Sequence, residues 1–286
     1  MRLSDLGELG LLAELERTGL VTGIEHDAAQ IDGLVVTQDA LVEGFHFRLD
    51  WIGWRELGFR AAAVNVSDLA ASGARPEALL VTLGAPGETD ADDVLDFYRG
   101  FAEAGFPVVG GDTTAADNVL VSVTALGRAD RVPGRAGARP GDALVVTGPL
   151  GAAGAAFRER RFVRPPLRVE EGIRLARNAH AMLDISDGLA RDAGHIAARS
   201  GCRLIIELDR VPLASGATID DIAFGEDFEL LAATPKQGDC TVIGRCEAGE
   251  GVELRREGEP VELGGWDHFA RGADSIRDDG TSNSRG

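Results

Sequence analysis

The hydrophobic and polar positions along the chain follow two periodicities, which predict a mixture of helices and strands. Leu6, Leu9, Leu12 and Leu15 lie along one helical face, so a helix is predicted over residues 1–20. Further helices are predicted over residues 54–74, 90–105 and 189–201. Strands are predicted over residues 33–38, 78–85, 106–114, 118–129, 143–148, 203–209, 228–234 and 240–246, with a short strand leading into Asp184. Because these elements do not alternate in strict βαβ order, the pattern favours an α+β layered fold.

A segment rich in proline, glycine and arginine, "DRVPGRAGARPGD" over residues 130–142, predicts a domain boundary. The chain of 286 residues is long enough for two domains, each with its own core. We therefore expect an N-terminal domain over residues 1–137 and a C-terminal domain over residues 138–270. The polar segment 271–286 is predicted to be a disordered tail.

Composition excludes several classes of function. A net charge of -18 argues against a nucleic-acid surface, which needs clustered Lys and Arg. No apolar run is long enough to span a bilayer or to act as a signal peptide, so we predict a cytoplasmic protein without a membrane partner. The three cysteines form no CxxC pair and are expected to be reduced thiols. Lys236 is the only lysine and lies outside any GxxxxGK pattern, which excludes a P-loop.

Carboxylates recur where predicted strands and helices end, with apolar or glycine neighbours. They are Asp27, Asp39, Asp68, Asp112, Asp184, Asp187 and Asp227. A carboxylate in an apolar setting is costly unless it is paired or binds a cation. Each one alone is better explained as a turn or cap residue. Together, in a chain with one lysine, they favour a site for magnesium and a nucleotide. Asn65 lies one helical turn before Asp68 and is expected to orient it.

Each of three other motifs has two possible interpretations from the sequence. "GPLGAAG" after a strand, with Glu170 beyond it, suggests a dinucleotide site, but its glycine spacing is not GxGxxG. Arg135 is either a phosphate clamp or a solvated linker residue. Trp266 either stacks on a flat ring, with a cation–π attraction if that ring is cationic, or closes the edge of a core.

The pair His26-Asp27 follows a short apolar segment. If the chain is extended there, the two side chains point to opposite faces, and only one can face the other carboxylates. Mg²⁺ prefers oxygen to imidazole nitrogen. Asp27 is therefore the predicted ligand, and His26 is predicted to lie on the outer side.

The motifs together resemble one family. They are "VTQDALVEGFHF", "LGFRAAAVNVSDLAASGA", "VVGGDTT", "ALVVTGPLG", "RPPLR", "AMLDISDGLARDAGHIA", "GEDFELL" and "GWDHF". In this order, and to about residue 269, they closely resemble the thiamine-monophosphate kinase family, in the superfamily of aminoimidazole-ribonucleotide synthetase and selenophosphate synthetase.

That resemblance implies a fold and a reaction. It implies a two-domain layered fold of the aminoimidazole-ribonucleotide-synthetase type, whose N-terminal sheet forms a barrel with that of a second subunit in a homodimer. ATP would lie between the domains. The implied reaction transfers the γ-phosphoryl group of ATP to thiamine monophosphate, with several Mg²⁺ ions neutralising the anionic partners.

The resemblance also implies roles for residues. The implied magnesium ligands are Asp27, Thr37, Gln38, Asp39, Asp68, Asp112, Asp184 and Asp187, of which Asp39, Asp68 and Asp112 are the implied catalytic residues. The implied ATP contacts are Gly111, Asp112, Arg135, Ser186 and Tyr98. The implied contacts to thiamine monophosphate are His46, Glu226 and Trp266.

The chain departs from the family pattern at a few positions. Glu25-His26-Asp27 stands where the family reads Gly-Asp-Asp, Gln38 replaces a Ser or Thr, and Phe224 replaces a glycine before "GED". Two alternatives to an active kinase follow. One is a degenerate homologue that binds nucleotide or thiamine phosphates without turnover, and the other is a superfamily relative with a different small acceptor.

Overall fold

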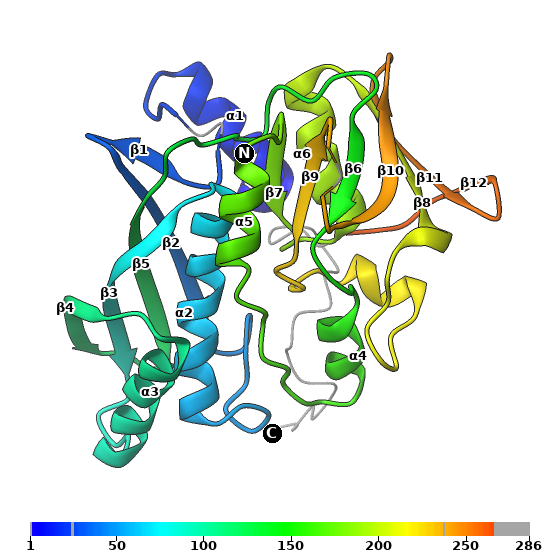
Figure 1. Cartoon of the computed structure of the whole chain (residues 1–286). Coiled ribbons are helices and arrows are strands. Elements are labelled where there is room, and N and C mark those ends of the chain that lie inside the picture. The colour runs from blue at the N-terminus through cyan, green and yellow to red at the C-terminus, as the bar shows by residue number, and fades with distance from the viewer. Residues whose placement is uncertain (1, 24–25, 237, 266–286) are drawn as a thin grey trace.

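The protein contains two mixed β-sheets, each with its own helices and its own hydrophobic core (Figure 1). The computed structural model describes residues 2–23, 26–236 and 238–265. Each sheet contains both antiparallel and parallel strand pairs, without the strict βαβ alternation of a doubly wound sheet. The expectation of two layered domains is confirmed.

The first sheet is built from residues 29–128 and has the strand order β1-β2-β5-β3-β4. Its strands are β1 (Ala29–Ile31), β2 (Leu34–Val42), β3 (Arg75–Ala85), β4 (Val108–Ala115) and β5 (Leu120–Arg128). Helices α2 (Trp54–Ala71) and α3 (Ala91–Ala104) cover one face of it. The two helices cross at glycines, because a Cβ on Gly58 would lie 1.9 Å from the Phe97 carbonyl oxygen.

The second sheet is built from residues 143–261 and has the strand order β12-β11-β8-β10-β6-β9-β7. Its strands are β6 (Ala143–Val146), β7 (Ala181–Asp184), β8 (Arg203–Glu207), β9 (Leu230–Thr234), β10 (Thr241–Glu247), β11 (Gly251–Arg256) and β12 (Glu259–Val261). The helices are α4 (Ala152–Arg158), α5 (Val169–Ala176), α6 (Leu189–Ser200) and the short 3₁₀ helices η1 (Leu208–Arg210) and η2 (Ile219–Ala223). Strand β6 is antiparallel to both of its neighbours, so "GPLGAAG" does not open a parallel βαβ unit and the dinucleotide interpretation is wrong.

Several predicted boundaries are wrong. Strand β2 continues to Val42, so Asp39 lies inside the strand and not at its end. The predicted strand over residues 106–114 agrees with β4 to within two residues and contains Asp112. Pairing with β5 over eight residues holds Asp39 and Ala40 in the strand, although neither favours that conformation alone. The first helix, α1, spans Leu3–Arg17 and is interrupted at Gly7, which has a φ of 67°. Strands β1, β11 and β12 and helix α5 were not predicted.

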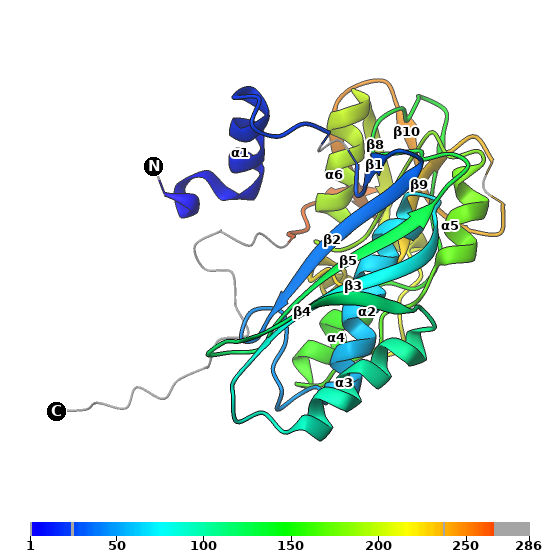
Figure 2. The same ribbon diagram turned by 90° about the vertical axis from the view of Figure 1, so that its left-hand side faces the viewer.

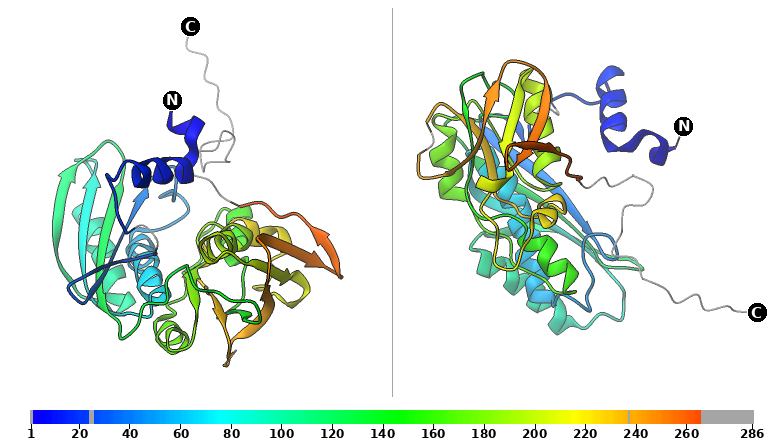
Figure 3. Two further views of the ribbon diagram at one scale, coloured as in Figure 1. Left: turned by 90° about the horizontal axis from the view of Figure 1, so that it is seen from above. Right: turned by 90° about the vertical axis from the view of Figure 1, so that its right-hand side faces the viewer.

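Helix α2 lies on the side of the first sheet that faces the second unit (Figure 3). Its last turn packs against α5, and Ala70 and Ala71 share a buried cluster with Leu175 and Met182. A Cβ on Gly172 would lie 2.1 Å from the Ala70 carbonyl oxygen. The small residues of α2 therefore allow a close approach, and α2 becomes a wall between the two sheets.

The opposite face of the first sheet is not covered by a described helix (Figure 2). Among the described residues it carries exposed apolar side chains, including Leu80, which is 39% exposed, and Leu120, which is 36% exposed. The five-stranded sheet is open, with β1 and β4 at its edges. No barrel closes within the described part of one chain.

Cys202, Cys240 and Cys246 form no disulfide with one another in the structure. Within the described ranges, no helix combines the length and the apolar character needed to cross a membrane. The predicted tail over residues 271–286 lies outside the described residues.

Candidate functional site

A cavity of about 730 Å³ runs between the two units along α2. Eleven of the predicted site residues line it. They are Asp27, Thr37, Gln38, Asp39, His46, Asp68, Arg135, Asp184, Ser186, Asp187 and Glu226. The folding of the chain therefore gathers residues from positions 27 to 226 around one space.

Three carboxylates form the centre of this site. Oxygen atoms of Asp27, Asp68 and Asp184 all lie within 4.8 Å of one another. They come from the loop before β1, from α2 and from the end of β7. Asp184 is 5% exposed, and the side chain of Asp27 is 3% exposed. Buried carboxylates at such distances repel one another, and a bound cation would compensate this repulsion.

Neighbouring side chains fix the orientation of these carboxylates. The Thr37 hydroxyl donates to Asp68, and the Ser67 hydroxyl donates to Asp184. Asn65 was predicted to orient Asp68, but it does not. Its side-chain oxygen accepts the backbone N–H of Asp39 at 3.0 Å. The prediction failed because the Asn65 side chain faces β2 and there accepts the Asp39 N–H.

Arg135 is the cation nearest to the acidic cluster. Its Nε and Nη2 both contact Oδ1 of Asp27, at 2.8 Å and 2.5 Å. Burial lowers the pKa of Arg135, but Asp27, Asp184 and Asp192 outweigh it and raise that pKa overall. The predicted phosphate clamp and a predicted metal ligand are thus paired with each other in the ligand-free chain.

The electrostatics of the cluster favour a bound cation. Burial raises the pKa of Asp184 to about 7, and the charge of Asp27 adds to this effect. Burial also raises the pKa of Asp68 well above its usual range, the charges of Asp39, Asp184 and Asp27 reinforce this, and the Thr37 hydroxyl opposes it. Because the donors are carboxylate and hydroxyl oxygens without a thiolate, the residues present fit Mg²⁺.

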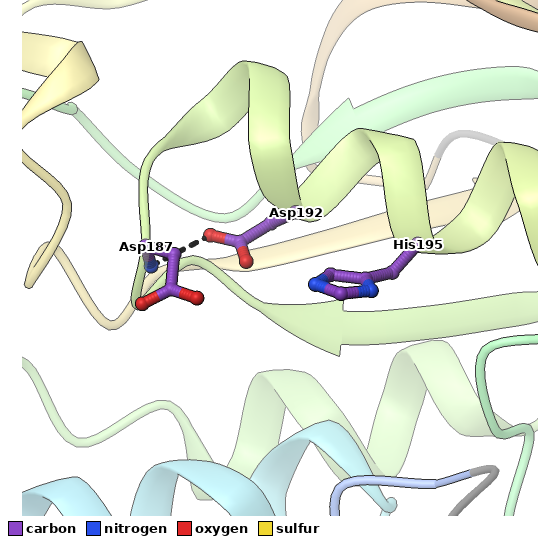
Figure 4. A group of neighbouring side chains, drawn as sticks. All are labelled: Asp187, Asp192 and His195. Atoms are coloured by element: carbon purple, nitrogen blue, oxygen red, sulfur yellow. Dashed lines mark hydrogen bonds between the residues drawn. The ribbon is translucent and has the colours of Figure 1, made fainter. Parts of the chain in front are cut away.

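A second acidic group lies at the start of α6 (Figure 4). Ligand atoms of Asp187, Asp192 and His195 lie within 4.8 Å of one another. Asp192 is 3% exposed and accepts the backbone N–H groups of Ser186 and Asp187, both at 3.0 Å. Burial lowers the pKa of His195 to about 4, with help from Arg135 and Arg191, so this histidine is neutral at pH 7. Asp192 therefore shapes the loop that presents Ser186 and Asp187.

The other end of the cavity is aromatic. The rings of Trp51 and Phe157 are 5.7 Å apart, edge to face, and those of Phe157 and Phe224 are 4.8 Å apart. All three line the cavity, beside Glu226. Phe224, which replaces a family glycine, thus adds a ring to the wall. Glu226 is paired with Arg60 of α2, whose Nη2 contacts both carboxylate oxygens.

Some predicted residues do not reach the cavity within one chain. Asp112 pairs in register with Thr82, Thr82 with Ser122, and Ser122 with Ala40. This row places Asp112 three strands, or about 14 Å, from Ala40. Gly111 lies beside it in the edge strand β4, and Tyr98 packs against Phe97 and Phe101 in α3.

Three more predictions have separate outcomes. The Gln38 side chain donates to Ser122 at 3.0 Å and lies on the face of β2 opposite to Thr37, because alternate residues of a strand face opposite ways. Trp266 lies outside the described residues. Asp227, whose carboxylate accepts the backbone N–H groups of Gly151 and Ala152 at the start of α4, is a cap and not a member of the acidic cluster.

The interpretation of His26 needs a correction. Residues 26–28 form a bend and not a strand, so the two-face argument does not apply. His26 and Asp27 both line the cavity. The His26 ring lies against Gly134, where a Cβ would come within 2.1 Å of Nδ1. His26 is therefore beside the acidic cluster and not on the outer side.

Sequence reasoning missed Arg60, Ser67 and Asp192. A signal existed for Arg60, because it lies eight residues before Asp68 in the same helix and so shares its face. No signal in the sequence pointed to Ser67 or Asp192, which are indistinguishable from ordinary helical polar residues until their partners are known.

Comparison with known proteins agrees with this architecture. Residues 25–129 match the family model of the AIR synthase related protein, N-terminal domain, and residues 139–257 match that of the C-terminal domain. Thiamine-monophosphate kinase of Aquifex aeolicus is 35% identical, with 94% of this chain and 100% of that protein covered. The chain belongs to the thiamine-monophosphate kinase family.

Other members of the family agree in length and structure. Thiamine-monophosphate kinase of Mycobacterium tuberculosis is 34% identical over 93% of this chain and 93% of that protein. A solved structure of AaThiL complexed with AMPPCP and TMP has a TM-score of 0.86 and 35% identity, and the match covers 94% of this chain and 99% of that one. Both AIR synthase related domains are present in this chain.

Proposed function

We propose that this chain transfers the γ-phosphoryl group of ATP to the phosphate of thiamine monophosphate, forming thiamine diphosphate and ADP. The observation that carries the proposal is the cavity, which has a cluster of buried carboxylates at one end and aromatic rings at the other. With a cation held by the carboxylates, such a space suits a ligand with an anionic end and flat rings. Membership of the kinase family supports the same reaction.

The chain's own residues position the two anionic substrates. Asp27, Asp68 and Asp184 would hold Mg²⁺, which when bound neutralises the charge that builds up on the transferred phosphoryl group. Thr37 and Ser67 keep the carboxylates of Asp68 and Asp184 in place. Arg135 would pass from Asp27 to an ATP phosphate once a cation takes over the charge of Asp27.

The altered first motif does not remove a carboxylate from the cluster, because Asp27 is retained in it. An active kinase is therefore favoured over a non-catalytic homologue. Purified protein with Mg²⁺, ATP and thiamine monophosphate should form thiamine diphosphate, measured by chromatography in a single turnover with enzyme in excess. Reactions with EDTA or without thiamine monophosphate are the controls. A rise in melting temperature with these ligands but no product would support the non-catalytic homologue instead.

We also propose that the active form is a homodimer in which the open faces of two N-terminal sheets come together as a barrel. Asp112 and Gly111 lie in an exposed edge strand, about 14 Å from the β2 residues of their own site. The same sheet exposes Leu80 and Leu120 among its described residues. A second copy would cover this apolar face and could bring its Asp112 to the site.

Mixing two inactive variants tests this arrangement. Asp68→Asn and Asp112→Asn subunits, unfolded together and refolded, should recover about a quarter of the wild-type activity. About half of the dimers formed by random pairing are mixed, and each mixed dimer then contains one site with both carboxylates intact. Each variant refolded alone is the control. If mixing restores no activity although the mixed dimer is isolated, Asp112 serves the site of its own subunit.

A further inference from the structure

Arg60 is a buried cation with an incomplete set of partners at the aromatic end of the cavity. The residue is 6% exposed, and its Nη2 contacts both oxygens of Glu226. Its Nε is shielded from solvent and has no hydrogen-bond partner among the described residues. A buried donor without a partner is costly, so its presence at the wall of a cavity points to a ligand acceptor.

The position of Arg60 along α2 sets its distance from the phosphate end. Arg60, Val64 and Asp68 all line the cavity and follow one another at intervals of four residues. Eight residues of α-helix span about 12 Å. A ligand whose phosphate lies at the carboxylates around Asp68 therefore extends along α2 and presents its far end to Arg60.

The surroundings of Arg60 suit a flat ring. Trp51, Phe157 and Phe224 line the same cavity and contact one another in series. Glu226 itself has a φ of 57°, an uncommon backbone conformation for a residue other than glycine, and its N–H donates to the Ser186 carbonyl. The loop thus holds the Glu226 carboxylate next to the guanidinium, although the backbone there is strained.

Arg60 and Glu226 together present a hydrogen-bond donor beside an acceptor. Because Arg60 neutralises Glu226, this pair offers no net negative charge to attract the cationic thiazolium ring. The aminopyrimidine ring of thiamine carries the complementary pattern, an exocyclic amino group that donates beside a ring nitrogen that accepts. We propose that Arg60 is a specificity-determining residue, which with Glu226 recognises this edge of the aminopyrimidine ring. The proposal rests on the function proposed above.

The test compares thiamine monophosphate with oxythiamine monophosphate, in which an oxo group replaces the amino group and the ring nitrogen carries a proton. The position of the amino group then changes from donor to acceptor, and the ring nitrogen changes from acceptor to donor. The bond to the second ring prevents the pyrimidine from turning over to restore the original order. Wild-type enzyme should prefer thiamine monophosphate by about a hundredfold in kcat/KM. Arg60→Lys, which keeps the charge beside Glu226, should reduce that preference by about tenfold or more, mainly through a higher KM for thiamine monophosphate.

The preference is a ratio measured on one preparation, so it does not depend on the fraction of correctly folded enzyme. Arg55→Lys is the matched control in the same helix, since Arg55 pairs with Asp96 and Glu103 outside the cavity. It should keep the wild-type ratio within about twofold. If Arg60→Lys does not fold, Glu226→Gln gives a second measurement, because an amide can turn either a donor or an acceptor to the ring and should also lower the ratio.

An unchanged ratio in Arg60→Lys, or a wild-type enzyme without a preference, would overturn the assignment of Arg60. Absence of any turnover with thiamine monophosphate would instead contradict the proposed function. In that case the ratio of the two dissociation constants, measured by calorimetry with the same variants, tests Arg60 on the same scale.

Discussion

Asp68→Asn should lower kcat/KM for thiamine monophosphate by about a thousandfold, equivalent to roughly 4 kcal/mol of transition-state stabilisation. Asp68 shares the cluster with Asp27 and Asp184, and its carboxylate is held by Thr37. An asparagine keeps the shape and one acceptor oxygen but removes the negative charge that would bind Mg²⁺. The fold should be kept, because the substitution also removes the repulsion among the buried carboxylates.

Two measurements distinguish a lost metal ligand from a damaged fold. The melting temperature of metal-free Asp68→Asn at pH 8 should be equal to or higher than that of the wild type. Asp142→Asn is the matched control, because Asp142 is also buried, at 4% exposure, but pairs with His180 outside the cavity. It should lower stability and leave kcat/KM within about threefold. Near-normal activity of Asp68→Asn would remove Asp68 from the proposed metal site.

The metal-free protein should become less stable as the pH rises from about 4 to 8. Burial raises the folded-state pKa of Asp184 to about 7 from its ordinary value of 3.8. Between these two values the folded protein binds a proton that the unfolded chain has released, so the free energy of unfolding falls with rising pH, by up to about 4 kcal/mol in total. The raised pKa of Asp68 acts in the same direction. The lowered pKa of His195, about 4, acts in the opposite direction below pH 6.5.

Urea denaturation of wild type and Asp184→Asn in EDTA isolates the contribution of Asp184. Because His195 and the other titrating groups are common to both proteins, the variant should gain stability relative to the wild type as the pH rises, and the gain should level off above pH 7. Mg²⁺ should raise the melting temperature of the wild type more at pH 8 than at pH 5, since the ion needs ionised carboxylates. A constant difference between the two proteins over this range would contradict the raised pKa of Asp184.

Much of the fold follows from short-range patterns. The helices around residues 54–74 and 189–201 were predicted because apolar periodicity and terminal glycines are local signals. The continuation of β2 through Asp39 and Ala40 could not be predicted, since it depends on pairing with β5, more than 80 residues later in the chain. Strand β4 was predicted over residues 106–114, but its place as an edge strand paired in parallel with β3 was not.

The types of residue in the sequence already predicted the chemistry of the site. Aspartates in apolar settings, together with a single lysine, indicated cation-dependent phosphate chemistry, and the order of the motifs indicated the family. The distances could not be read in this way. Asp27, Asp68 and Asp184 meet within 4.8 Å because the loop before β1 and the end of β7 both approach α2, while the pairing register keeps Asp112 away. The partner of Arg60 is 166 residues away in the chain, at Glu226. The sequence shows which charged groups are present. Long-range packing decides which of them lie close enough to interact, and their pKa values and their binding of substrate depend on those interactions.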